Sequence, residues 1–152
     1  MLYFVTGNFW ERSADVRVNP VNCVGVMGAG VARQFKERYP EMFLDYRLAC
    51  RRGDVKPGKL HIFQVLDCTI ANFPTKRDWR DRSRLEDVES GLVALAECLG
   101  RLGPVRVTLP ALGCGLGGLV WADVKPLIQR HLGELRAEIW CYLPEDFRHE
   151  GR

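Results

Sequence analysis

Short apolar runs of strand length alternate with longer amphipathic stretches along nearly the whole sequence. The short runs are rich in β-branched and aromatic residues, whereas the longer ones repeat apolar residues at helical spacing. Strands are expected at Leu2–Thr6, Val16–Asn22, Leu60–Leu66, Thr69–Phe73, Val105–Leu109 and Ile139–Leu143. Helices are expected at Gly30–Tyr39, Glu41–Arg51, Leu85–Leu102 and Ala122–Leu132. This mixture predicts an α/β fold with a mostly parallel or mixed sheet of six strands, covered by helices on both faces.

The chain length fits one domain. Its 152 residues leave no room for a second, and a composition of 47% hydrophobic and 27% charged residues is that of a folded globular chain. No apolar run approaches the roughly 18 residues that a membrane span requires. The opening residues, Met1 to Val5, carry neither a basic leader nor a cleavage site. We therefore expect a single cytoplasmic domain over residues 1–152, monomeric and without membrane contact.

The cysteines and histidines are too widely spaced for a metal site. The six cysteines stand at positions 23, 50, 68, 98, 114 and 141, and no CxxC pair occurs. The histidines are equally scattered, so the short ligand spacings of structural zinc are missing. The cysteines are therefore interpreted as free thiols in a reducing compartment, and we expect no metal and no other cofactor.

A basic segment runs from Lys76 to Arg84. It holds five basic and two acidic residues, and so supplies the whole formal charge of +3. A polyanion would bind such a cluster because each phosphate that is neutralised releases counterions. Trp79 adds an aromatic ring of the kind on which bases stack. The alternative is a solvated loop whose arginines pair with neighbouring carboxylates, namely Asp78, Asp81, Glu86 and Asp87.

Two glycine-rich loops each follow a strand and precede a helix. Loop 1 runs from Asn22 to Ala32, and loop 2 from Pro110 to Leu119. Glycine lets backbone amides approach an anion closely, and a helix amino terminus adds partial positive charge. Two such loops indicate a diphosphate held from both sides, although glycines that only form tight turns remain the alternative for each loop.

Other nucleotide and nucleophile motifs fit poorly. Gly113, Gly115 and Gly118 match GxGxxG, but a Rossmann fold places that fingerprint on its first strand and not in the last third of the chain. Neither loop contains GxxxxGK[ST]. The serines stand outside any nucleophile elbow, and Cys114 has no histidine in its motif to act as a base. A packing role is therefore expected for Cys114.

Both loops resemble the ADP-ribose-binding loops of macrodomains. The opening Thr6-Gly7-Asn8-Phe9-Trp10 resembles the start of that family, and the likeness covers nearly the whole chain in order and spacing. The segment Phe73-Pro74-Thr75-Lys76-Arg77-Asp78-Trp79-Arg80 narrows it to the branch of terminal ADP-ribose protein glycohydrolase and the DarG antitoxins. The resemblance implies a three-layer α/β/α macrodomain that removes ADP-ribose from thymidine in single-stranded DNA, reversing a DarT-type toxin. Antitoxins of this type carry a further C-terminal region, which leaves open whether the chain is one domain of a longer protein.

Lys76 is the expected nucleophile. Only five of the 22 basic residues are lysines, and lysine can lose its proton whereas arginine cannot. Nearby Arg77 and Arg80, together with desolvation under a nucleotide, are expected to disfavour the ammonium form. The resemblance implies attack at the anomeric carbon of the distal ribose, with the sugar transiently held on Lys76. The alternative is a lysine that contacts phosphate or solvent.

The remaining site residues follow from the loops, the basic segment and the resemblance. Substrate binding is expected from Asn8, Asn22, Met27, Gly28, Ala29, Gly30, Val31, Gly113, Cys114, Gly115, Leu116 and Gly117. DNA binding is expected from Arg77, Trp79, Arg80, Arg82 and Arg84. Asn22 is expected either to hold hydroxyls of the distal ribose or to cap its own turn.

The sequence departs from its relatives at two positions. Gly117 stands where the protein-directed relative carries an aspartate for acid/base chemistry, so the chain lacks an evident general acid. Asn8 stands where many macrodomains have an aspartate near the adenine, and an amide can still form hydrogen bonds there. Two further functions stay open, namely an ADP-ribose reader without catalysis and a protein-directed glycohydrolase.

Overall fold

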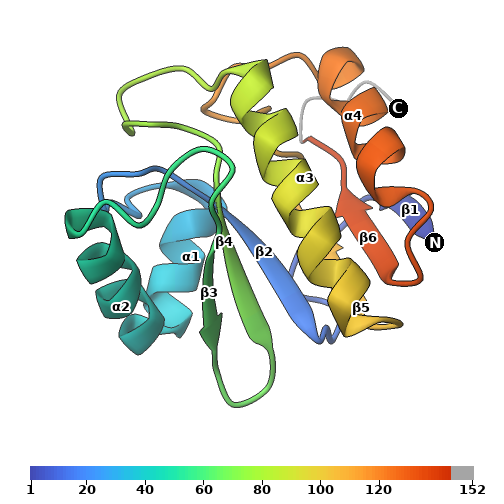
Figure 1. Ribbon diagram of the computed structural model, residues 1–152, viewed down its shortest axis with the longest axis horizontal. Helices are drawn as coiled ribbons and strands as arrows, with labels where there is room; N and C mark the ends of the chain where they lie inside the picture. Colours follow the sequence, from blue (N-terminus) through green and yellow to red (C-terminus); the bar gives the residue numbers. More distant parts are fainter. Residues whose placement is uncertain (145–152) are drawn as a thin grey trace.

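Six strands form one mixed sheet at the centre of the molecule (Figure 1). The computed structural model describes residues 1–144, and its strand order is β1-β6-β5-β2-β4-β3, with β3 alone antiparallel to its neighbour. The strands are β1 Leu2–Val5, β2 Val16–Val21, β3 His61–Gln64, β4 Thr69–Pro74, β5 Arg106–Leu109 and β6 Glu138–Tyr142. The predicted sheet is confirmed, and each strand begins and ends within two residues of the predicted position.

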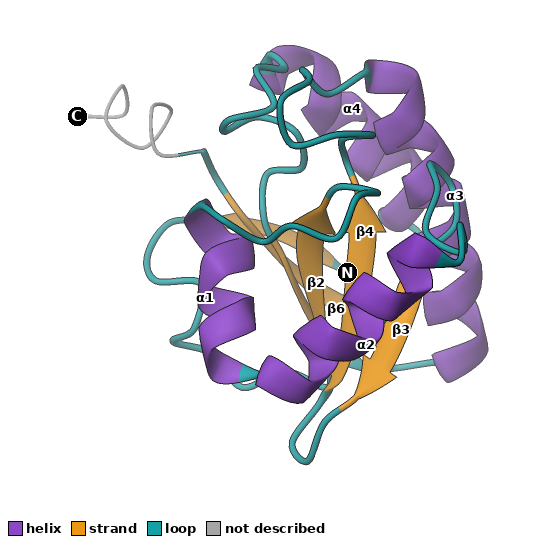
Figure 2. Ribbon diagram, turned by 90° about the vertical axis from the view of Figure 1, so that its left-hand side faces the viewer, coloured by secondary structure: helices purple, strands orange, loops and turns teal. Residues whose placement is uncertain are grey.

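Helices cover both faces of the sheet (Figure 2). On one face lie α1 Gly30–Arg38 and α2 Pro40–Arg51, and on the other α3 Leu85–Leu102 and α4 Trp121–Leu132. Pro40 begins α2 at a position where its missing N–H costs nothing, and so separates α2 from α1. Within residues 1–144, none of the helices combines the length and apolar character needed to cross a bilayer. The predicted three-layer α/β/α architecture is confirmed.

Alternate residues of the strands build two separate cores. Val16 and Val18 of β2 pack toward α3 and α4, whereas Val21 packs toward α1 and α2. This division follows from the alternation of side chains along a strand. Because both faces of the central strands are buried, the sheet holds the loops at its ends on a rigid base.

The helix that follows β2 and the helices that follow its two neighbouring strands lie on opposite faces of the sheet. After β2 the chain passes to α1 on one face, whereas after β4 and β5 it passes to α3 and α4 on the other. In parallel sheets, ligands bind in the crevice outside the carboxyl ends of strands at such a switch point. Loop 1, Lys76 and loop 2 follow β2, β4 and β5 respectively, so the fold brings them to this edge.

Candidate active site

A cleft of about 680 Å³ opens at the carboxyl ends of β2, β4 and β5. Both glycine loops line it, together with the start of the basic segment. The lining residues are Pro20, Val21, Asn22, Val26, Gly28, Ala29, Gly30, Val31, Ala32, Thr75, Lys76, Trp79, Pro110, Ala111, Gly113, Gly115, Leu116 and Gly117. The cleft therefore unites the two loops that the sequence predicts to bind a diphosphate.

The amino end of α1 lies at the cleft and has no side-chain cap within residues 1–144. Among the described residues, no side chain hydrogen-bonds its first turn, and that turn contains no acidic residue. Gly30, Val31 and Ala32 of this turn line the cleft. The first amides of a helix lack partners within it and carry the positive end of its dipole, so this wall suits a phosphate group.

The side chain of Asn22 is bound within loop 1. Its Nδ2 donates to the carbonyl of Val26 at 2.7 Å, and its Oδ1 accepts from the amides of Val24 and Val26 at 3.1 and 3.3 Å. The buried hydroxyl of Tyr46 lies 2.7 Å from the carbonyl oxygen of Asn22 and 2.9 Å from its Oδ1. Of the two roles considered for Asn22, these contacts favour the turn over the ribose.

Tyr46→Phe is expected to destabilise the protein by about 1 to 2 kcal/mol, since it keeps the ring but removes the donor that loop 1 uses. Urea unfolding measures the change. Tyr3→Phe is the matched control, because within residues 1–144 the hydroxyl of Tyr3 hydrogen-bonds only to Met1 Sδ, in an exposed position. Equal free energies of unfolding for both variants would contradict the role assigned to Tyr46.

Met27 anchors loop 1 in the core. Its side chain is 1% exposed and packs with Phe35 beneath α1, with Sδ 3.8 Å from Nδ2 of Asn19. The sequence predicted that Met27 binds substrate, but this side chain points into the protein. The sequence could not show this, because an apolar residue in a glycine loop fits either position.

Lys76 is held beside loop 1. The amide of Cys23 donates to the carbonyl of Arg77 at 3.1 Å, and its Sγ lies 3.5 Å from the carbonyl of Lys76. The Nζ of Lys76 is 3.3 Å from the carbonyl oxygen of Trp79. Of the described residues that line the cleft, Lys76 alone has an ionisable side chain.

Two arginines of the basic segment are neutralised by carboxylates. Nε and Nη2 of Arg77 both lie 3.1 Å from the carboxylate oxygens of Asp87, and those of Arg80 lie 3.0 and 2.9 Å from Asp78. Hydrogen bonds from Arg80 lower the pKa of Asp78 to about 2. Neither arginine therefore acts on Lys76 as the unpaired charge that the sequence led us to expect.

The far end of the basic segment packs on loop 2. The amide of Ser83 donates to the carbonyl of Gly117 at 3.0 Å, and the guanidinium of Arg82 to that of Gly118 at 3.2 Å. A Cβ at position 117 would lie 2.3 Å from Oγ of Ser83 and 2.5 Å from the carbonyl oxygen of Gly113. Loop 2 and the basic segment therefore meet where only glycine fits.

Cys114 and Asn8, which were predicted to bind substrate, form contacts with residues close to them in the chain. Burial raises the pKa of the Cys114 thiol to about 11, and its Sγ lies 3.6 Å from the carbonyl of Leu112. This thiol stays protonated near neutral pH, in keeping with a packing role. The Oδ1 of Asn8 accepts from the amide of Trp10 at 2.8 Å, and Asn8 does not line the cleft.

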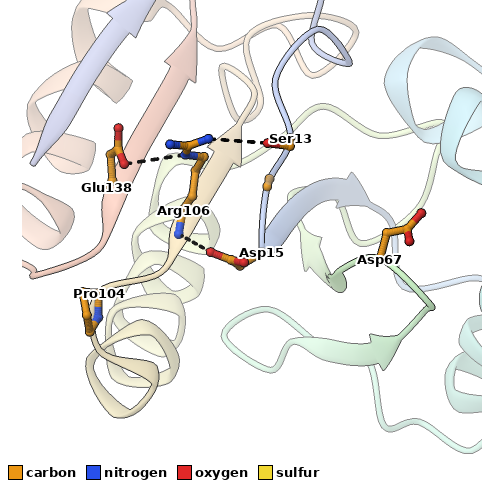
Figure 3. Close-up of a pocket in the computed structure, with 7 residues that line it drawn as sticks. Ser13, Asp15, Asp67, Pro104, Arg106 and Glu138 are labelled. Atoms are coloured by element: carbon orange, nitrogen blue, oxygen red, sulfur yellow. Dashed lines mark hydrogen bonds and ion pairs between the residues drawn. The ribbon is translucent and has the colours of Figure 1, made fainter.

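A second cavity, of about 360 Å³, lies at the amino ends of β2, β5 and β6 (Figure 3). There the guanidinium of Arg106 lies 3.6 Å from Glu138 and 3.4 Å from Ser13, and its backbone amide donates to Asp15 at 2.8 Å. Arg106 and Glu138 form an ion pair there, and none of the predicted site residues lines this cavity. The cleft between the glycine loops is therefore the candidate site.

Similarity to known proteins identifies the family of this chain. A family model described as Macro domain matches residues 18–128. The chain belongs to the macrodomain family. This macrodomain is 44% identical over 149 residues to a Thermus aquaticus protein named DNA ADP-ribosyl glycohydrolase, across 95% of this chain and 41% of that protein. The chain thus spans less than half the length of that relative.

Solved macrodomain structures are similar over almost the whole chain. The macrodomain of Mycobacterium tuberculosis DarG has a TM-score of 0.90 at 40% identity, covering 95% of this chain and 99% of that one. The Thermosipho africanus DarTG structure, in complex with ADP-ribose, has a TM-score of 0.88 at 34% identity, covering 95% and 42%.

Most of the predicted binding residues line the cleft of this macrodomain. Exceptions are Asn8, Met27, Cys114, Arg77, Arg80, Arg82 and Arg84. Sequence reasoning missed seven lining residues, namely Pro20, Val21, Val26, Ala32, Thr75, Pro110 and Ala111. Most of these residues lie at or just after the end of a strand. They could have been predicted from the position of each loop directly after a strand.

Proposed function

We propose that this macrodomain is a glycohydrolase that removes ADP-ribose from thymidine bases of single-stranded DNA and acts as antitoxin to a DarT-type ADP-ribosyltransferase. The observation that carries the proposal is Lys76, the single ionisable side chain among the described residues of a cleft walled by two glycine loops. The name of the Thermus aquaticus relative and the ADP-ribose in the Thermosipho africanus structure support it. Such a substrate implies action in the cytoplasm.

The diphosphate is proposed to lie between the amino end of α1 and loop 2. The uncapped first turn of α1 offers amide donors on one side. On the other side, Gly113 has a φ of 73°, a left-handed conformation that lets loop 2 turn its backbone toward the ligand. Binding both phosphates would fix the distal ribose, which lies next along the ligand, toward Lys76.

The proposed reaction begins when the neutral amine of Lys76 attacks the anomeric carbon of the distal ribose. A carbon–nitrogen bond forms to Lys76 as the bond to the thymine nitrogen breaks, and the electron pair of that bond leaves with the base. The thymine takes up the proton that the lysine nitrogen releases, by way of water. A second water then attacks the same carbon, which frees ADP-ribose and returns the amine.

Arg84 is proposed to contact DNA phosphate, because its guanidinium has no ion-pair partner among residues 1–144. We expect Arg84→Ala to make the fall of kcat/KM with salt shallower, by about 0.7 in the log–log slope, as for one lost phosphate contact on a single strand. Arg101→Ala is the control, since Arg101 lies in the last turn of α3, the helix that begins directly after Arg84. The same salt slope in Arg84→Ala and the wild type would rule out that contact.

A protein-directed glycohydrolase is the less favoured alternative. The protein-directed relative carries an aspartate at the place of Gly117, and here Ser83 and Gly113 fill the space that its Cβ would need. Incubation with ADP-ribosylated single-stranded oligonucleotide, beside an ADP-ribosylated protein, tests the proposal. We expect free ADP-ribose and restored thymidine from the oligonucleotide. Binding without release would identify a reader, and release from protein alone would identify the other enzyme.

A further inference from the structure

Thr75 lines the cleft beside Lys76 and carries a hydroxyl. It is only 5% exposed, and its side chain has no hydrogen-bond partner among the described residues. Solvent nevertheless reaches its hydroxyl oxygen. Because Thr75 lines the cleft, the accessible part of this buried residue opens onto the space where the ligand would lie.

The backbone explains why neighbours Thr75 and Lys76 both reach the cleft. Their amides donate to the same carbonyl oxygen, that of Val21, at 2.9 and 3.4 Å. The chain therefore turns as it leaves β4, and the two side chains do not alternate between faces as they would within a strand. Val21 belongs to the central strand β2, so this turn is fixed to the rigid sheet.

The other polar side chains of the cleft are less suited to assist a leaving group. Among the described lining residues there is no carboxylate and no imidazole. The amide of Asn22 is committed to loop 1. Trp79 is 52% exposed at the rim, where a hydrogen bond competes with water, whereas a buried donor acts in a less polar medium and is stronger.

We propose that Thr75 is a catalytic residue whose hydroxyl donates a hydrogen bond to a carbonyl oxygen of the departing thymine. The inference rests on the proposed function and deepens it, because it names the group that replaces the missing carboxylic acid. When the glycosidic bond breaks, its electron pair spreads from the ring nitrogen onto the adjacent carbonyl oxygen. The hydroxyl stabilises that charge without giving up its proton, which remains on Thr75, and the thymine nitrogen is protonated through water as above.

The test compares two substrates that differ in their need for this help. One is the ADP-ribosylated oligonucleotide, and the other is 4-nitrophenyl ADP-ribose, whose phenolate leaves readily and carries its charge into the nitro group. Thr75→Val removes the hydroxyl and keeps the shape of the side chain, while Thr75→Ser keeps the hydroxyl. We expect Thr75→Val to lower kcat on the oligonucleotide about 30-fold, the size of one hydrogen bond to a charged group, and to change kcat on the nitrophenyl compound less than about threefold.

Thr75→Ser is expected to restore most of the oligonucleotide activity, with ADP-ribose affinity unchanged in both variants. Equal losses on the two substrates, a parallel loss of ADP-ribose affinity or full activity in Thr75→Val would each overturn the role of Thr75. The wild type in the same assay tests the proposed function separately. If it releases no ADP-ribose from the oligonucleotide, that function fails, whatever the variants do on the nitrophenyl compound.

Discussion

Lys76→Ala is expected to lower the turnover of ADP-ribosylated DNA by at least about a thousandfold, because it removes the atom that attacks the sugar. The affinity for ADP-ribose is expected to change less than about tenfold. The diphosphate site proposed here is made of backbone amides of loop 1, loop 2 and α1, and these do not depend on the Lys76 side chain. Single-turnover kinetics with labelled oligonucleotide and calorimetric titration with ADP-ribose measure the two quantities.

Lys76→Arg distinguishes a nucleophile from a phosphate-binding cation. Arginine keeps the positive charge, but its guanidinium stays protonated and cannot attack carbon. We expect this variant to be as inactive as Lys76→Ala. Recovery of a tenth or more of wild-type turnover in Lys76→Arg would mean that charge alone is needed, and would contradict covalent catalysis.

Gly117→Ala is expected to weaken ADP-ribose binding about 100-fold, an effect near the upper end of those seen for overpacking. Its Cβ would overlap Oγ of Ser83 and the carbonyl oxygen of Gly113, at 2.3 and 2.5 Å, so loop 2 or the basic segment must move. Gly117→Asp is expected to bind at least as poorly and to gain no activity on ADP-ribosylated protein. Calorimetry and a protein-substrate assay measure these outcomes.

Two controls isolate the contact at position 117. Gly100→Ala adds a Cβ that meets nothing within 4 Å, and is expected to leave affinity unchanged. Adding Ser83→Gly to Gly117→Ala removes one of the two overlaps, so part of the lost affinity is expected to return. If Gly117→Ala binds ADP-ribose like the wild type, the tight packing of loop 2 on the basic segment is not what shapes the site.

The fold and the position of the cleft were predictable because they depend on short-range pattern. Alternating and helical periodicities identified every element, and a glycine loop after a parallel strand lies at the carboxyl edge whatever its details. Lys76 was identifiable as a residue of this cleft because it is a lysine that begins an arginine-rich segment two residues after the end of β4.

The roles of individual loop side chains were less predictable, since distant contacts decide them. Asn22 is turned inward by Tyr46, which lies 24 residues away on α2. The guanidinium of Arg82 donates to the carbonyl of Gly118, 36 residues away, a contact that no local pattern indicates. Thr75 gave no signal in the sequence, because the turn after β4 that brings it into the cleft depends on Val21 of the neighbouring strand.

Trapping the sugar on the enzyme tests covalent catalysis most directly. Cyanoborohydride reduces the imine with which a lysine-bound sugar equilibrates, and so fixes the adduct during turnover of ADP-ribosylated oligonucleotide. After digestion, mass spectrometry is expected to find ADP-ribose on the peptide that contains Lys76, and none in Lys76→Arg. Efficient turnover by the wild type with no adduct on that peptide, or with an adduct on another residue, would contradict the proposed role of Lys76.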